Sequence, residues 1–214
     1  MPVIVCFGDS NTYGFDVATL GRFPREVRWP GVLAAELGGI AEVIEEGLNG
    51  RTTIWDDPYE PGRNGRTYLL PCLRSHAPID VLVLMLGTND TKTIFGRSAA
   101  EIAAGAGALV DVMLTSGTGP DGGAPRVLLI APPCPGEVTE RSEVWGFGEA
   151  RAKGERMPGL YRTIAGMAGV AFLDASVLVG VDPADGVHLT PEGHGVLGRA
   201  VAAAVREILG SAAG

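Results

Sequence analysis

The chain has 214 residues, of which 46% are hydrophobic and 20% are charged, and its formal net charge at pH 7 is -8. This length and composition are typical of a globular α/β domain with a substantial buried core. The acidic balance and the lack of any Lys/Arg cluster in the sequence argue against nucleic acid or an anionic membrane as a partner, because binding to phosphates needs concentrated positive charge.

Apolar runs rich in β-branched residues predict five strands. They lie at residues 3–7, 42–45, 80–86, 126–131 and 170–174. The third contains the sequence VLVLML and the fourth contains VLLIA. Runs that are apolar throughout favour strands buried on both faces of a parallel sheet.

Helix-like stretches alternate with these strands, at residues 29–37, 67–76, 98–115, 154–167 and 190–209. Ser98 and Glu101 form a capping-box pattern, and Thr190 before Pro191 is a helix-start signal. Pro71 lies inside the second stretch, so we expect only part of it to be helical. The alternation predicts a three-layer α/β/α sandwich on a flavodoxin-like, five-stranded parallel sheet of strand order 2-1-3-4-5, with right-handed crossovers.

The organisation of the chain predicts a single domain over residues 1–214, because no linker or repeat divides it. Two loops, residues 52–66 and 132–153, are unusually long, and we expect them to shape a pocket or a subunit contact. The three cysteines are widely spaced, and we expect no secretory signal, because residue 1 is followed at once by an apolar strand-like run. No apolar run approaches the ~20 residues of a membrane span, so we expect a cytoplasmic protein with reduced thiols.

Ser10 directly follows the first predicted strand, and ligands bind at the carboxyl ends of strands in an open α/β sheet. Asp185 and His188 follow much later, shortly before the last helix. A serine nucleophile needs a base, and the base needs an orienting carboxylate. A purely structural interpretation makes Ser10 a helix cap. The three residue types together predict a serine hydrolase acting on esters, with Ser10 as nucleophile, His188 as base and Asp185 as orienting group.

The other two histidines are weaker candidates for the base. His76 ends a predicted helix, where a cation suits the helix dipole, and His194 follows a helix start.

Donors for a developing oxyanion are expected after the second and third strands. Asn89, in Gly-Thr-Asn-Asp, can offer its side-chain amide, although such a segment can also simply close a strand. Gly50 can present its backbone N–H with no side chain in the way, and the N–H of Ser10 is the third expected donor. No metal or cofactor is expected, because the serine and its base supply the chemistry.

These blocks occur in one order along the chain: Gly-Asp-Ser at Ser10, then Gly50, then Asn89, then Asp-x-x-His at 185–188. Together they resemble the SGNH hydrolases, also called the GDSL esterase family, over residues 7 to about 209. The resemblance implies a triad of Ser10, His188 and Asp185, and an oxyanion hole made by Ser10, Gly50 and Asn89.

Further segments are similar to the bacterial arylesterase/acyltransferase branch of that family. They lie at residues 28–34, 43–48, 51–53 and 85–92. This resemblance implies hydrolysis of short acyl esters of aryl or alkyl alcohols, with water or an alcohol as acyl acceptor. It also implies homo-oligomers, including octamers.

Three residues are predicted to bind the substrate. Asn49 directly precedes Gly50, and Trp145 and Phe147 lie in the second long loop. We expect the two aromatic residues to line the alcohol side of the pocket or the entrance of a neighbouring subunit. The alternative is that they pack within their own loop.

Three other functions remain open. A carbohydrate acetylesterase of the same family shares every catalytic residue. A flavodoxin-like binding module would use the helix start at Ser10 as an anion site. A phospho-accepting receiver domain is disfavoured, because only Asp9 follows the first strand and no Lys follows Asp174.

Overall fold

Five parallel strands form the central sheet of the structure, a computed structural model that describes residues 1–210. From edge to edge they are β4 (Glu42–Gly47), β1 (Val3–Gly8), β5 (Val81–Met85), β6 (Arg126–Ala131) and β7 (Ala171–Asp174). This is the predicted order 2-1-3-4-5, which is confirmed. Gly8 pairs with Gly47 on one side and Met85 on the other, so the segments that follow these three strands begin side by side.

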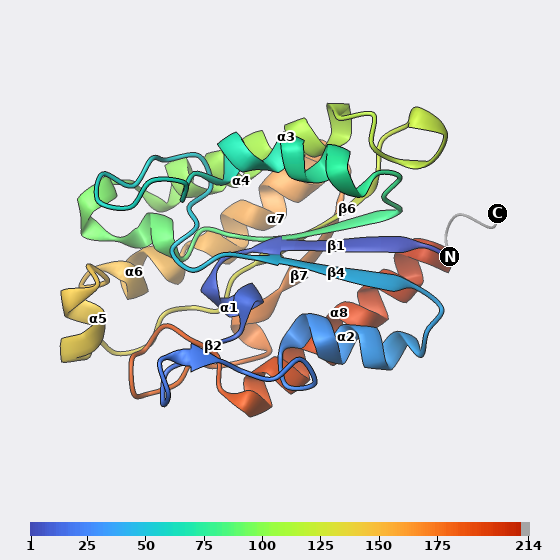
Figure 1. Cartoon of the computed structure of the whole chain (residues 1–214). Coiled ribbons are helices and arrows are strands. Elements are labelled where there is room, and N and C mark those ends of the chain that lie inside the picture. The colour runs from blue at the N-terminus through green and yellow to red at the C-terminus, as the bar shows by residue number, and fades with distance from the viewer. Residues whose placement is uncertain (211–214) are drawn as a thin grey trace.

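Helices cover both faces of the sheet (Figure 1). One face carries α3 (Gly65–His76), α4 (Ala99–Thr115) and α7 (Met157–Ala168), and the other carries α2 (Trp29–Leu37) and α8 (Pro191–Gly210). Alternate residues of β1 enter different cores: Val5 and Phe7 pack with the first group of helices, and Ile4 and Cys6 pack with the second. The predicted α/β/α layering is confirmed.

Shorter elements gather beyond the carboxyl ends of the strands, toward the left of Figure 1. They include α1 (Ser10–Tyr13), β2 (Phe15–Asp16), α5 (Glu140–Val144) and α6 (Ala150–Gly154). β3 (Gly21–Arg22) pairs with β2 in a small antiparallel sheet. The 3₁₀ turns are η1 (Asn89–Thr91), η2 (Thr93–Phe95), η3 (Pro120–Gly122) and η4 (Ala175–Val177).

Two predicted helix starts are confirmed by their capping hydrogen bonds. The N–H of Glu101 donates to Ser98 Oγ at 3.2 Å, and the N–H of Ser98 donates to Glu101 Oε2 at 2.9 Å. At α8, the N–H of Gly193 donates to Thr190 Oγ1 at 3.1 Å. These bonds satisfy backbone donors that the first turn of a helix leaves free.

The prediction that only part of residues 67–76 is helical is wrong. α3 is helical throughout and starts earlier, with the N–H of Arg66 donating to the side chain of its N-cap Asn64 at 3.0 Å. A proline lacks one N–H and therefore removes one hydrogen bond of the ladder. The buried contacts of Leu69 and Leu73 hold the helix against the sheet despite that loss.

The prediction of one long loop over residues 132–153 is also wrong in part, because α5 and α6 lie within it. Thr139 begins α5 with a capping box whose partner is Ser142, not the usual Glu or Gln, so the sequence signal is weak. The helix expected at 154–167 begins at Met157, and Gly154 ends α6.

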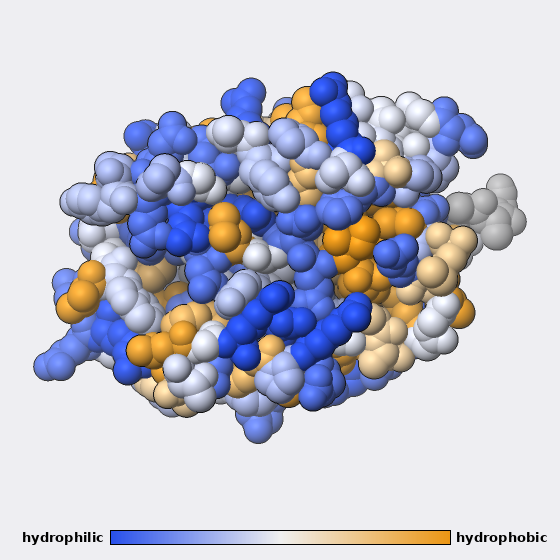
Figure 2. All heavy atoms as spheres, in the orientation of Figure 1, coloured by the Kyte–Doolittle hydropathy of each residue, from blue (hydrophilic) through white to orange (hydrophobic). Residues whose placement is uncertain are grey.

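The face of the molecule drawn in Figure 2 is mostly hydrophilic, with hydrophobic residues in separate patches. Within residues 1–210, none of the helices combines the length and the apolar character that crossing a membrane requires.

Candidate active site

Ser10 occupies the first position of α1, immediately beyond β1. The N-cap of this helix is Asp9, whose Oδ1 accepts a hydrogen bond from the N–H of Asn11 at 2.9 Å. The purely structural interpretation, in which Ser10 caps the helix, is therefore wrong. The hydroxyl of Ser10 lies 2.9 Å from Nε2 of His188.

Asp185 holds the other side of the His188 ring. Asp185 Oδ2 lies 2.6 Å from His188 Nδ1, and Oδ1 accepts hydrogen bonds from the backbone N–H groups of Val187 and His188. Burial alone raises the pKa of Asp185, but hydrogen bonds and charge from His188 outweigh it and leave the pKa below its ordinary value. The ionised carboxylate fixes the proton on Nδ1, so Nε2 is free to accept from Ser10.

Asn11 joins the two distant segments and was not among the predicted site residues. Its Oδ1 accepts from the N–H of Leu189 at 2.9 Å, and its Nδ2 donates to the carbonyl of Val187 at 3.3 Å. The two partners flank His188 on either side. Asn11 directly follows Ser10 in the sequence, and that adjacency is the signal that could have identified it.

The two weaker histidine candidates bond elsewhere. His194 is fully buried, and its Nδ1 accepts from the N–H of Trp29 at 3.3 Å. Burial, with smaller effects of the neighbouring His188 and Arg28, lowers the pKa of His194 to about 4. His76 Nε2 lies 2.8 Å from a carboxylate oxygen of Glu46.

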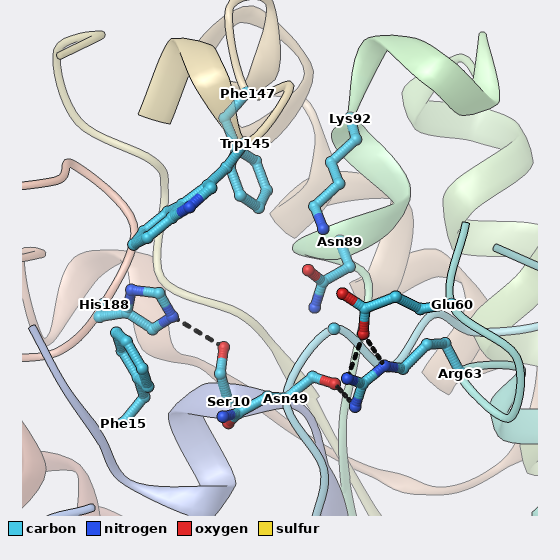
Figure 3. Close-up of a pocket in the computed structure, with 11 residues that line it drawn as sticks. Ser10, Phe15, Asn49, Glu60, Arg63, Asn89, Lys92, Trp145, Phe147 and His188 are labelled. Carbon is cyan, nitrogen blue, oxygen red and sulfur yellow. Dashed lines mark hydrogen bonds and ion pairs between the residues drawn. The ribbon is translucent and has the colours of Figure 1, made fainter. Parts of the chain in front are cut away.

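The three predicted oxyanion donors line one cavity of about 320 Å³ together with His188 (Figure 3). Asn89 Nδ2 donates to the carbonyl of Arg51 at 3.1 Å, which sets the orientation of its amide. Gly50 has φ +75°, a conformation that L side chains rarely adopt. The structure thus brings Ser10, Gly50 and Asn89 together on one wall of this cavity.

Two buried carboxyl groups lie next to these residues in the sequence: Asp9 precedes Ser10, and Asp90 follows Asn89. Both oxygens of Asp90 accept from the N–H of Thr53 at 3.1 Å, which ties η1 to the segment after Arg51. Burial, despite hydrogen bonds that act the other way, raises the pKa of Asp90 to about 6 and that of Asp9 to about 6.

Aromatic rings form a second wall around His188. The rings of Phe15 and Trp145 lie 4.6 Å and 5.8 Å from the imidazole, centroid to centroid. Trp145 and Phe147 both line the cavity, while Phe147 also packs against Val187. Phe15 was not predicted, because a lone aromatic residue just after α1 carries no distinctive sequence signal.

Further polar side chains line the cavity opposite the aromatic rings, and of these only Asn49 was predicted. They are Asn49, Glu60, Arg63 and Lys92. Glu60 accepts from Nε of Arg63 at 2.9 Å, and Arg63 also donates to the carbonyl of Asn49. Lys92 extends into the cavity beside Asn89 (Figure 3). Burial lowers the pKa of Lys92, and the carboxylates of Asp57 and Glu60 partly oppose this shift. Lys92 was not predicted, although its place three residues after Asn89 could have indicated that it lies near the site.

The chain is similar to a family of hydrolases and to several solved esterases. The model of the GDSL-like lipase/acylhydrolase family matches residues 6–196. A carbohydrate acetylesterase from Sinorhizobium meliloti and the native aryl esterase of M. smegmatis are each 41% identical to this chain, with a TM-score of 0.92 over 97% of this chain and 100% of theirs.

A further carbohydrate acetylesterase family member from S. meliloti is 37% identical, with a TM-score of 0.92 over 98% of this chain and 100% of its own. No curated protein matches the chain.

Proposed function

The chain belongs to the GDSL-like lipase/acylhydrolase family, and from that premise we propose that it is a serine esterase that hydrolyses short-chain acyl esters through an acyl-enzyme. Membership confirms the predicted resemblance, and acylhydrolase function follows from it. The finer proposal is supported above all by one observation, the hydrogen-bonded series of Asp185, His188 and Ser10 at the wall of a cavity. A flavin-binding module or a receiver domain has no need of such a series.

The first half of the reaction forms the acyl-enzyme. Ser10 Oγ attacks the ester carbonyl carbon while His188 Nε2 accepts the hydroxyl proton. The negative oxygen of the tetrahedral intermediate accepts hydrogen bonds from the N–H groups of Ser10 and Gly50 and from the Asn89 amide. His188 then gives the proton to the leaving alcohol as the carbon–oxygen bond breaks, and the acyl group stays on Ser10.

The second half reverses this path. Water attacks the acyl-enzyme while His188 takes its proton, and the carboxylic acid leaves as Ser10 regains a proton. An alcohol in place of water yields a new ester. Rings of Phe15 and Trp145 beside His188 offer an apolar contact to such an alcohol, which supports acyl transfer as a side activity.

The size of the cavity favours short acyl groups. Its volume of about 320 Å³ lies at the lower end of ligand-binding cavities. Aryl and alkyl acetates fit such a space, with the flat aryl group against Phe15, Trp145 and Phe147.

A carbohydrate acetylesterase is the second candidate, and the polar wall favours it. Glu60, Arg63 and Lys92 present charged groups that hydrogen-bond hydroxyl-rich alcohols. The same triad would serve both substrates, so the alcohol part of the ester decides between them.

A substrate panel tests both candidates. Turnover of p-nitrophenyl acetate, butyrate and octanoate by the wild type should fall with acyl length. Ser10→Ala should remove it by roughly 10⁴-fold or more, while Asn89→Ala should lose about 10²–10³-fold in kcat. When a competing alcohol is added, acyl transfer is detected as the formation of a new ester.

Two results of this panel would contradict the proposal. If the folded wild type cleaves acetylated sugars but no aryl ester, the carbohydrate acetylesterase replaces the proposal. If Ser10→Ala retains turnover, the serine mechanism is contradicted.

We also propose that the chain, as a single domain over residues 1–214, acts in the cytoplasm as a homo-oligomer, without nucleic acid or membrane partners. The exposed apolar side chains of Tyr59 and Val144 support self-association. Both line a second cavity, which shares Glu60, Lys92 and Trp145 with the catalytic one. An adjoining subunit at this rim would narrow the entrance to Ser10.

A further inference from the structure

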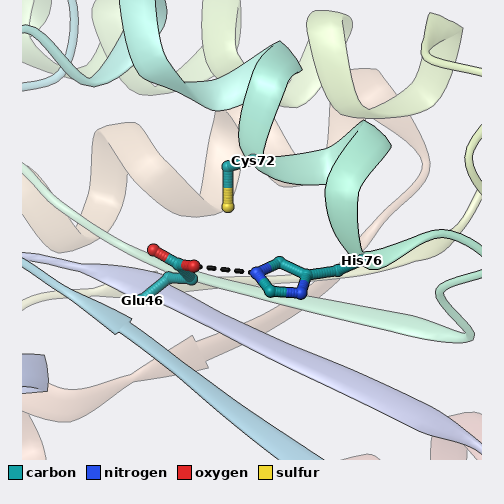
Figure 4. Close-up of side chains that lie close together, drawn as sticks. All are labelled: Glu46, Cys72 and His76. Carbon is teal, nitrogen blue, oxygen red and sulfur yellow. Dashed lines mark hydrogen bonds and ion pairs between the residues drawn. The ribbon is translucent and has the colours of Figure 1, made fainter.

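Glu46, Cys72 and His76 lie close together between β4 and α3, and none of them lines the catalytic cavity (Figure 4). One ligand atom from each, a carboxylate oxygen, Sγ and a ring nitrogen, lies within 4.8 Å of the other two. Cys72 and His76 are one helical turn apart on α3 and share a face. Glu46 faces them from the end of β4.

We propose that these three side chains form a binding site for a zinc ion, or a transition-metal ion of the same preferences, separate from the catalytic residues. Thiolate, imidazole and carboxylate are the usual ligands of Zn²⁺, and a thiolate does not suit Mg²⁺ or Ca²⁺. With Cys72 as thiolate and Glu46 as carboxylate, the two negative ligands balance the charge of a divalent ion.

The three ligand atoms all lie within 4.8 Å of one another and would adjust by side-chain rotation to the separations that such an ion requires. His76 Nε2 and Glu46 Oε1 are 2.8 Å apart. Bonds of about 2.0–2.2 Å at tetrahedral angles place such atoms about 3.3 Å apart, and a zinc–sulfur bond of about 2.3 Å places Sγ about 3.6 Å from the nitrogen. His76 is the last residue of α3, so side-chain rotations suffice to open the pair by about half an ångström.

The surroundings orient one ligand and leave a path for the ion. The hydroxyl of Tyr68, one turn before Cys72, donates to Glu46 Oε2 at 3.3 Å and fixes the carboxylate as an outer-shell partner does in known metal sites. The side chains of His76 and Glu46 are 26% and 18% exposed, while Cys72 is buried. A cavity of about 450 Å³ is lined by Glu46 and Tyr68 and reaches the carboxylate from the other side.

Two features oppose binding. The thiol of Cys72 is buried, and a metal ion must displace its proton. The guanidinium of Arg51 lies near this thiol and repels a cation.

Cobalt titration of the full chain, first treated with a chelator, tests the proposal. Co²⁺ bound to a thiolate gives charge-transfer absorption in the near ultraviolet and the visible bands of a tetrahedral ion. We expect both signals to saturate at one ion per chain and to be displaced by Zn²⁺. Cys72→Ser should remove the charge-transfer band and weaken Zn²⁺ binding at least on the order of 100-fold, since losing even an outer-shell partner costs 10- to 100-fold.

A second variant and a control keep the result interpretable. His76→Ala changes a partly exposed side chain at a helix end, so it should fold normally and still weaken binding. Cys134→Ser removes a different free thiol and should leave the spectrum unchanged. No cobalt–thiolate band in the wild type, or a band that survives Cys72→Ser and vanishes in Cys134→Ser, overturns the site, whatever the esterase assay gives.

Discussion

The imidazole of His188 is held from several sides and faces the cavity on another. Asp185 bonds Nδ1, Ser10 lies at Nε2, and the rings of Phe15 and Trp145 pack against its face and edge. Asn11 clamps the residues on either side of it. A base held this firmly loses little entropy on reaching the geometry for proton transfer.

Replacing Asn11 should therefore slow the reaction more than it weakens substrate binding. Asn11→Ala removes the bonds to Val187 and Leu189, and misplacing a catalytic group by about 1 Å can cost roughly 10²-fold. We expect kcat for an aryl acetate to fall about 10- to 100-fold, with KM nearly constant. The kcat of Asn11→Asp should fall less, because an Asp keeps the oxygen that accepts from the N–H of Leu189. Unchanged kcat in a folded Asn11→Ala protein would show that the clamp does not position His188.

The buried carboxyl of Asp9 should make the protein less stable at high pH. Its pKa is raised from 3.8 to about 6 in the folded state, so the stabilising protonated form is fully present below pH 3.8 and is lost as the pH rises through about 6. A shift of about two pKa units corresponds to about 3 kcal/mol. We therefore compare the change in unfolding free energy that Asp9→Asn causes at two pH values. This change should be more favourable at about pH 8 than at about pH 4, by up to about 3 kcal/mol.

Denaturant unfolding at the two pH values measures this difference. Asp16→Asn is the matched control, because a hydrogen bond from Thr19 lowers the pKa of the exposed Asp16, and its loss should not stabilise the protein at high pH. Equal effects of Asp9→Asn at both pH values would mean that Asp9 titrates normally.

At the scale of elements, the site is assembled where three neighbouring strands end. β1 delivers Ser10, β4 leads to Gly50 and β5 leads to Asn89. Arg51 ties the first two together, since its guanidinium donates to the carbonyls of Gly8 and Glu46 and lies over the ring of Phe7. The donors are thus held in place by hydrogen bonds that exist before any substrate binds, and such preorganisation lowers the cost of stabilising charge during the reaction.

Gly87, between β5 and η1, leaves no room for a side chain. It has φ +124°, and a Cβ would lie 2.2 Å from the Tyr161 hydroxyl, which donates to the carbonyl of Leu86. Gly87→Ala should cost about 3 kcal/mol or more, from backbone strain and overpacking. Gly159→Ala, in α7 with open space around it, should be neutral or slightly stabilising. Equal melting temperatures of the two variants would contradict this account.

At the scale of the whole molecule, the catalytic cavity lies at one end of the sheet and its rim is partly apolar. Val144 is 85% exposed and Tyr59 is 82% exposed. Hydrophobic spheres at the left edge of Figure 2 lie over α5, the helix that contains Val144. Large exposed apolar side chains around a cavity are typical of interaction surfaces.

The proposed self-association can be measured by light scattering. The wild type should have a mass that is a multiple of 22.1 kDa, and Val144→Asp should shift it toward the monomer, because a buried unpaired carboxylate is costly. Met167→Asp changes a side chain of similar exposure, 80%, on α7 and should leave the mass unchanged. A wild-type monomer would contradict the oligomer.

Local patterns determined most of the fold. Buried parallel strands must be apolar on both faces, so runs such as residues 80–86 can be recognised as strands. Caps such as Ser98 and Thr190 mark helix starts, because they accept hydrogen bonds from residues three positions later. The sequence also indicated Ser10, Asn89, Asp185 and His188 as candidates, because the proposed chemistry requires those residue types, and the structure brings them together. It was weaker at α3 and α5, where tertiary contacts and an unusual cap replaced the common signals.

Only the tertiary structure decided which side chains meet. Ser10 and His188 are 178 positions apart, and Phe15 and Lys92 join them at one cavity only after the strands are ordered in the sheet. The pairing of Glu46 with Cys72 and His76 likewise depends on α3 packing over β4. Periodicity records whether a residue is buried, but not which distant residue it faces, because that choice is made by the packing of whole elements.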